Sequence, residues 1–179
     1  ILPPVRGMEQ EGNRYTGFLY AGLMINPAGE PKVIEYNCRF GDPETQPIML
    51  RLKSDIVPLC QAACRGELAG KTIEFDERAS VGVVLAAGGY PGSYNKGDEI
   101  TGFEDAAKLD GKVFHAGTAL EDGKVVTAGG RVLCATALGH NVTEAQQNAY
   151  TLLKTIQFKD VYFRNDIAHR AIAREAEAS

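Results

Sequence analysis

The residues best suited to carry chemistry lie between positions 33 and 46, in the run VIEYNCRFGDPETQ. Its β-branched and aromatic start favours a strand. Because side chains on a strand alternate between its two faces, Glu35 and Asn37 should point the same way, about 7 Å apart. A carboxylate and an amide oxygen suit Mg²⁺, which takes one or two protein oxygens and completes its shell with water and phosphate. The same pattern also fits the polar side of a half-exposed edge strand.

Charged residues continue into the turn that follows. Arg39 extends the alternation from Asn37 and would add a planar cation suited to phosphate or carboxylate. Asp42 and Glu44 flank Pro43, and a helix that opens near Glu44 would offer its N-terminal N–H groups to anions. A metal, a cation and a helix start this close together predict a site for phosphoryl transfer, where catalysis is mostly positioning and charge neutralisation. The alternative is a capped loop-to-helix junction with a surface ion pair.

These residues carry a family resemblance. The run RFGDPE at 39–44, within VIEYNCRFGDPETQP, resembles the signature of the glycinamide ribonucleotide synthetase family, which are ATP-grasp ligases of purine biosynthesis. YTGFLYAGLMI upstream, and SVGVVLAAGGYPG, VFHAGT and GGRVL downstream, are similar to the same family in the same order. The resemblance covers nearly the whole chain. It implies an enzyme that joins glycine to 5-phosphoribosylamine with ATP, through a glycyl phosphate, and releases ADP and phosphate.

The resemblance also implies roles for individual residues. Glu35 and Asn37 would be the ligands of a Mg²⁺ or Mn²⁺ ion that bridges the ATP phosphates. Arg39 and Asp42 would be catalytic residues, beside the glycine and the acyl phosphate. The residues implied to bind substrate are Arg39, Gly41, Asp42 and Glu44.

Hydrophobic periodicity and turn residues predict an α+β fold in two parts. We expect residues 1–78 to be the C-terminal part of an ATP-grasp domain, with antiparallel strands at 15–25 and 31–40, the first of which should be covered on both sides. Residues 1–12 should be a loop or a helix end. Two helices should follow, one opened by Pro47 and one capped by Ser54-Asp55 and stopped by Gly66.

We expect residues 79–179 to be a small C-terminal α+β domain of antiparallel strands and helices. Its strands should begin at Ala79 and turn at 121–123 and 129–130, with a short strand at 161–164. One helix should run from a cap at Thr143 to about Gln157, and another should close the chain. The glycine-rich stretch 86–97 fits a tight turn better than a phosphate loop, because it lacks the GxxxxGK[ST] spacing. Gly129-Gly130-Arg131 could bring a cation to a cleft but fits a turn better, and His115 is expected to be a core or rim residue rather than a base.

Composition excludes several classes of function. The chain has 179 residues, 44% of them hydrophobic and 23% charged, which is ordinary for a globular protein. The formal charge of −4 argues against nucleic-acid binding, and no apolar run is long enough to span a membrane. The four cysteines form no CxxC pair and lie at no zinc-ligand spacing from a histidine. We therefore expect a cytoplasmic protein with reduced thiols.

The chain starts ILPPVRGMEQEG, without methionine, and we expect it to be a fragment. By the resemblance, an N-terminal domain, ATP-clamping lysines and a glycine-rich phosphate loop would precede residue 1. We therefore expect the isolated chain to be inactive, its partner to be the missing part of the same enzyme, and the full-length protein to be a monomer. The alternative is a non-catalytic small-ligand or protein-interaction module derived from an ATP-grasp enzyme.

Overall fold

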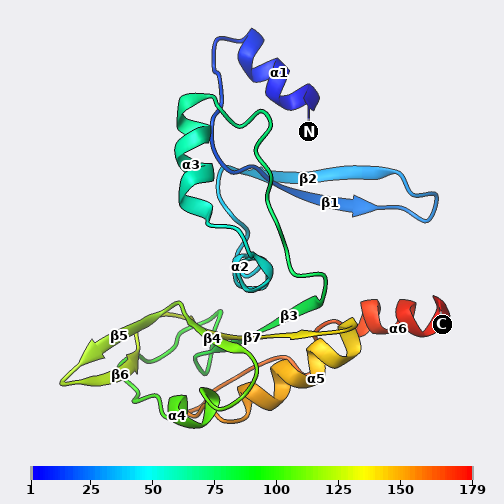
Figure 1. The fold of residues 1–179 in the computed structure, drawn as a ribbon. Coiled ribbons are helices and arrows are strands. Elements are labelled where there is room, and N and C mark those ends of the chain that lie inside the picture. Colours follow the sequence, from blue (N-terminus) through cyan, green and yellow to red (C-terminus); the bar gives the residue numbers. More distant parts are fainter. Residues whose placement is uncertain (1, 179) are drawn as a thin grey trace. The chain divides into compact units, whose positions relative to one another are not determined.

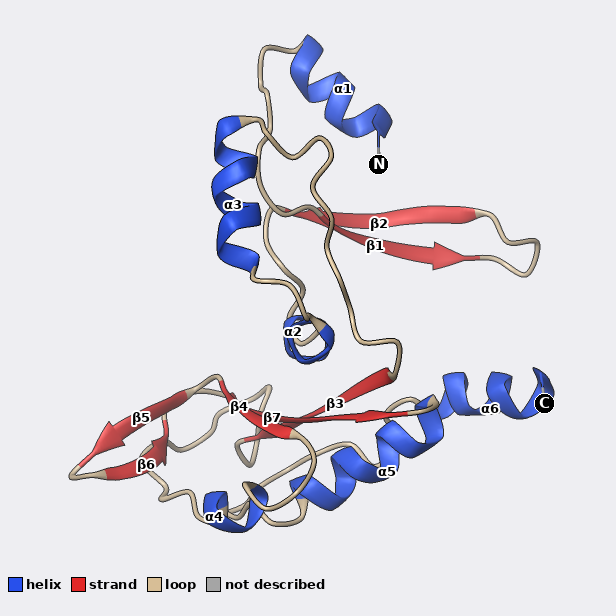
Figure 2. Cartoon of the chain, viewed as in Figure 1, coloured by secondary structure: helices blue, strands red, loops and turns tan. Residues whose placement is uncertain are grey.

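The computed structural model describes residues 2–178, which form two compact units (Figure 1). Unit 1 runs to Asp42 and resumes over Lys53–Glu74. Unit 2 takes in Pro43–Leu52 and the chain from Phe75 onward. Both units combine helices with antiparallel strands (Figure 2), so the predicted α+β class is confirmed.

Unit 1 is a β-hairpin accompanied by two helices. Its elements are α1 (Leu2–Gln10), β1 (Tyr20–Ile25), β2 (Pro31–Asn37) and α3 (Ile56–Arg65). The caps predicted for α3 are confirmed: the Asp55 carboxylate accepts a hydrogen bond from Val57 N at 2.9 Å, and Gly66 ends the helix in the left-handed conformation at φ 72°.

Unit 1 has almost no core of its own. Among its described residues only Gly41 and Ala62 are buried. Large apolar side chains of the hairpin are exposed instead, among them Met24 (61%), Ile25 (63%) and Ile34 (65%). Because these side chains are exposed, the hairpin gains little free energy from apolar burial within unit 1. A lone two-stranded hairpin is also only marginally stable in water.

The structure corrects three expectations for unit 1. The first strand begins at Tyr20 rather than residue 15, because the Tyr15 hydroxyl donates to the Phe18 carbonyl and closes a loop there. The second strand ends at Asn37 rather than residue 40. Strand β1 is not covered on both sides by the described residues, since its consecutive residues Met24 and Ile25 are both exposed. Residues 2–10 form helix α1, where a loop or a helix end was expected.

Unit 2 is built on a three-stranded antiparallel sheet of order β3-β7-β4, with a separate β5–β6 hairpin. Its elements are α2 (Thr45–Arg51), β3 (Ala79–Ala86), α4 (Phe103–Ala106), β4 (Lys112–His115), β5 (Thr118–Glu121), β6 (Lys124–Thr127), β7 (Arg131–Gly139), α5 (Val142–Leu153) and α6 (His169–Ala178).

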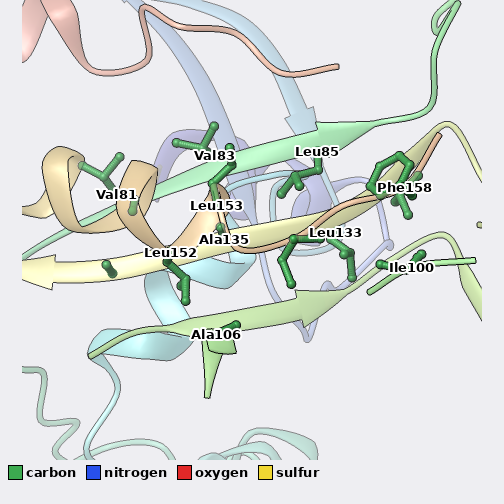
Figure 3. Packing of buried hydrophobic residues seen from close by; sticks show 14 of the residues in the cluster. Val81, Val83, Leu85, Ile100, Ala106, Leu133, Ala135, Leu152, Leu153 and Phe158 are labelled. Carbon is green, nitrogen blue, oxygen red and sulfur yellow. The ribbon is translucent and has the colours of Figure 1, made fainter. Parts of the chain in front are cut away.

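The main core lies between this sheet and α5 (Figure 3). Alternate residues of β3 and β7 point to this face and are fully buried with the apolar side of α5: Val83, Leu85, Leu133, Leu152 and Leu153. Burying one such aliphatic side chain contributes roughly 1.5–3 kcal/mol. Unit 2 therefore holds nearly all of the apolar burial among the described residues.

The opposite face of the same sheet is covered by α2, which contacts both β3 and β7. Gly82 of β3 lies beneath Pro47 of α2, and Cys134 and Thr136 of β7 are buried on this face, where their Sγ and Oγ1 atoms lie 3.4 Å apart. Helix α2 thus belongs by its contacts to the C-terminal sheet, although β1 and β2 precede it and α3 follows it.

Several element boundaries in unit 2 differ from those predicted. Helix α5 is capped by Asn141, whose side chain accepts from Glu144 N at 2.8 Å, and not by Thr143. It ends at Leu153, since Gln157 pairs with Thr101 in an isolated bridge. The stretch 161–164 forms only one bridge, from Tyr162 to Ala86, rather than a strand. No helix among residues 2–178 combines the length and apolar character needed to cross a lipid bilayer.

Candidate metal and substrate site

Glu35 and Asn37 lie on the regular end of β2. Asn37 pairs with Tyr20 and Glu35 pairs with Gly22 across the hairpin, without an irregularity between them. A β-bulge follows only beyond Gly22, toward Leu23. Since the alternation is uninterrupted from 35 to 37, both side chains project from one face of the hairpin. Glu35 is exposed and Asn37 is half-buried.

The two oxygen donors are available for a ligand. Within residues 2–178 neither the Glu35 carboxylate nor the Asn37 amide has a hydrogen-bond or ion-pair partner. No group of three or more His, Cys, Asp or Glu side chains in the described part of the chain could hold a metal by itself. One carboxylate and one amide oxygen nonetheless fit Mg²⁺ or Mn²⁺, whose remaining positions go to water and phosphate oxygens.

Gly22 is part of this arrangement and was not singled out by the sequence. A Cβ placed on Gly22 would come within 3.1 Å of the Glu35 Cγ. The Glu35 side chain therefore lies across the space that glycine leaves open on the neighbouring strand. An isolated glycine inside an apolar strand was the available signal, because it often marks a close approach.

Arg39 does not continue the strand alternation as predicted. Cys38 and Arg39 form a bend beyond the end of β2, and the Arg39 Nη1 donates to the Phe40 carbonyl at 2.7 Å. The Phe40 ring packs against Phe18 with ring centroids 4.1 Å apart. The bend leaves Arg39 exposed, beyond the end of the strand and in the segment that leads to Gly41.

The rest of the signature segment crosses from one unit to the other. Gly41 is buried and Asp42 is exposed in unit 1, while Pro43 and Glu44 belong to unit 2. Helix α2 begins at Thr45, where a helix start was predicted, and Glu44 is its N-cap residue without a side-chain cap bond. Five of the six predicted site residues therefore lie in unit 1, and Glu44 lies at the start of a helix of unit 2.

The other candidate features form turns and side-chain contacts. The stretch after β3 is a turn, as predicted: Tyr90 N donates to Ala87 O, and Gly92 N donates to Gly89 O. Arg131 Nε donates to the Tyr90 hydroxyl at 3.1 Å, a contact across 41 positions that the sequence did not indicate.

The predicted bend at 129–130 is also present. His115 is exposed at the end of β4, where its ring stacks on Phe103 and its Nδ1 lies 3.1 Å from Thr118 Oγ1. It is a rim residue with a partner, as the sequence led us to expect.

Comparison with known proteins assigns the class and then the family. Residues 1–45 match the model of the ATP-grasp (A) domain of phosphoribosylglycinamide synthetase, so the hairpin is of ATP-grasp type. Residues 80–170, just over half of the chain, match the C domain of phosphoribosylglycinamide synthetase. The chain belongs to the phosphoribosylglycinamide synthetase family.

Individual relatives agree with this assignment. The chain is 67% identical over 176 residues to a phosphoribosylamine–glycine ligase of Salmonella typhimurium, and 64% identical over 175 residues to one of Pseudomonas aeruginosa. Each match covers 98% of this chain but only 41% of the relative. A crystal structure of the Thermotoga maritima phosphoribosylamine–glycine ligase superposes with a TM-score of 0.72 at 41% identity, over 90% of this chain and 39% of that one. The chain thus spans about two fifths of the length of these relatives.

Proposed function

We propose that this chain is the C-terminal part of an ATP-dependent ligase that joins glycine to 5-phosphoribosylamine and forms glycinamide ribonucleotide. One observation carries the proposal: the Glu35 and Asn37 side chains project from one face of β2, in a stretch without irregularity between them, and neither side chain has a hydrogen-bond or ion-pair partner among residues 2–178. The adjoining signature segment supplies a cation and a helix start. The names of the relatives supply the substrates.

In the proposed reaction a carboxylate oxygen of glycine attacks the γ-phosphorus of ATP, which gives glycyl phosphate and ADP. The amine nitrogen of phosphoribosylamine then attacks the acyl carbon, loses a proton, and expels phosphate. Glu35 and Asn37 would hold a Mg²⁺ or Mn²⁺ ion, which supplies charge neutralisation to the ATP phosphates when bound. Arg39 would stabilise the negative charge of the acyl phosphate, Asp42 would lie beside the glycine, and Gly41 would let the backbone approach the substrate closely.

Glu44, at the start of α2, would complete the substrate-binding residues. Its carboxylate would bind the ammonium group of glycine, leaving the glycine carboxylate oriented toward the nucleotide. In domain terms, residues 1–78 would complete an ATP-grasp domain and residues 79–179 would form the C-terminal domain.

The remaining part of the enzyme would be the partner of this chain. The chain spans 41% of the Salmonella relative, and the apolar side chains of the β1–β2 hairpin are exposed. Polypeptide beyond this chain would cover that hairpin and supply most of the nucleotide pocket. The isolated chain should therefore show no turnover, and the full-length ligase should act as a monomer.

Binding of Mn²⁺, followed by electron paramagnetic resonance in the full-length ligase, tests the metal site. Loss of an outer-shell partner lowers metal affinity roughly 10- to 100-fold. Loss of a direct ligand in E35Q or N37A should therefore weaken Mn²⁺ binding at least as much. E30Q is a matched control, because Glu30 lies in the turn of the same hairpin, where it accepts a hydrogen bond from Asn26. Equal affinities for E35Q and E30Q would remove the basis of the proposal.

Turnover tests the reaction itself. The full-length ligase should release phosphate from ATP only when glycine and phosphoribosylamine are both present, and the isolated 179-residue chain should release none. Phosphate release by the isolated chain at the rate of the full-length enzyme would contradict the assignment of the nucleotide pocket to the missing part.

A further inference from the structure

Helix α2 connects the candidate site to the C-terminal sheet. It begins at Thr45, directly after Glu44, with no residue between the signature segment and the helix. Ile48 N donates to the Glu44 carbonyl at 3.3 Å, so the first turn of α2 fixes the backbone of Glu44. The direction in which the Glu44 side chain points therefore depends on where α2 is held.

The N-terminal half of α2 is held by a steric fit. Pro47 lies over Gly82 of β3, and a Cβ on Gly82 would be 2.9 Å from Pro47 Cγ, 3.2 Å from Pro47 Cδ and 3.0 Å from Cys134 Sγ. Each of these three separations is shorter than an ordinary van der Waals contact. Any side chain at position 82 would force the Pro47 ring, and with it the start of α2, away from the sheet.

The C-terminal end of α2 is held by hydrogen bonds. Arg51 Nε and Nη2 both donate to the Asp76 carbonyl, at 3.0 and 2.8 Å, and Asp76 N donates to the Arg51 carbonyl at 2.6 Å. The Asp76 carboxylate is itself held by Arg78, whose Nε and Nη2 donate to it at 3.0 and 2.8 Å. Both ends of α2 are thus held within unit 2, one by the middle of β3 and the other by the segment that leads into β3.

The boundary between the two units falls between Asp42 and Pro43, inside the signature segment. We propose that Gly82 and Arg51 are positioning residues for the ligase reaction: they hold α2 on the C-terminal sheet and so orient Glu44 toward the glycine. This inference rests on the proposed function, because it takes Glu44 to be a substrate-binding residue. It gives the C-terminal sheet a role in substrate binding although none of its residues needs to touch the substrate.

The test compares two neighbouring positions of β3 in the full-length ligase. G82A should move α2, raise the KM for glycine about tenfold or more, and leave the KM for ATP nearly unchanged, since misplacement by 1 Å can cost up to about 100-fold. V83A is the matched control: Val83 is fully buried on the opposite face of the sheet, under α5, so its truncation lowers stability without touching α2. The double variant G82A/P47A should recover most of the lost glycine affinity, because it removes the Pro47 ring.

Hydrogen exchange supplies a readout that does not depend on activity. In G82A and in R51A, the amides of residues 48–50 should exchange faster than in the parent, while in V83A and in R65A, which breaks an exposed pair with Glu67, they should not. If G82A and V83A change the KM for glycine equally, or if exchange at 48–50 is unchanged in G82A, the positioning role is wrong. If the parent ligase shows no glycine-dependent turnover, the proposed function fails, whereas exchange still decides whether Gly82 and Arg51 hold α2.

Discussion

The Glu35 side chain lies across Gly22 of the neighbouring strand, so close that a Cβ on Gly22 would be 3.1 Å from Glu35 Cγ. The two residues are directly paired in the hairpin. Gly22 thus leaves the space into which the candidate metal ligand extends. A methyl group there would have to push the Glu35 side chain aside by a few tenths of an ångström.

We therefore expect G22A to weaken divalent-metal binding without unfolding the protein. Displacing one of two protein donors should lower Mn²⁺ affinity by on the order of 10-fold, as loss of a supporting contact does in other metal sites. Titration of the full-length protein with Mn²⁺ measures this. G7A is the control, because a Cβ on Gly7 in α1 would meet no atom within 4 Å. Unchanged affinity in G22A would show that the Glu35 carboxylate does not need this space.

Local signals in the sequence were enough to predict some parts of the fold. Asp55 and Gly66 delimit α3 as expected, because a cap bond and a left-handed C-terminal residue act within a few positions. The direction of Arg39 could not be predicted, since the bend at Cys38 ends the alternation.

Long-range contacts could not be predicted from the sequence pattern. The pattern of α2 predicts a helix but not the sheet on which it packs, which depends on Gly82, 35 positions after Pro47. The same holds for the candidate site. Glu35 and Asn37 followed from strand periodicity, but the closeness of Gly22 to Glu35 depends on the pairing of the two strands.

The closing helix α6 is joined to α5 by a carboxylate. Glu175 accepts hydrogen bonds from Val142 N at 2.7 Å and from Thr143 N at 3.3 Å, at the N-terminus of α5. N-terminal helix N–H groups need such acceptors, and a negative charge there also interacts favourably with the helix dipole. We expect E175A to lower the free energy of unfolding by about 1–2 kcal/mol, measured by urea denaturation. E177A, on an exposed position of α6, should stay close to the parent, and an equal loss in both variants would contradict the role of Glu175.

The pKa of Asp166 offers a test of the segment before α6. Arg164 donates two hydrogen bonds to the Asp166 carboxylate, at 2.8 and 2.7 Å, and these lower the pKa of Asp166 below its ordinary value. Because the folded-state pKa is lowered, this pair favours the folded state above the ordinary pKa of the carboxyl group, and the contribution is lost as the pH falls through the lowered value. Carbon-13 NMR titration should show the pKa of Asp166 rising to its ordinary range in R164A and staying low in R170A. No rise in R164A would mean that the pair does not persist in solution.

The unequal distribution of buried residues predicts unequal protection from hydrogen exchange. Val83, Leu133 and Leu152 are fully buried in unit 2, whereas Ala62 is the only buried hydrophobic residue in the described part of unit 1. In the isolated chain the amides of β3, β7 and α5 should therefore exchange slowest, and those of β1 and β2 should exchange nearly as fast as in an unfolded peptide.

The variant L152A separates the two units in the same experiment. It should cost about 2–5 kcal/mol of unfolding free energy and speed exchange throughout unit 2, because it leaves a cavity under the sheet, while exchange in the hairpin should not change. In the full-length protein the hairpin amides should become protected, since additional polypeptide would cover Ile25 and Ile34. Strong protection of β1 and β2 in the isolated chain would instead mean that unit 1 is stable without that cover.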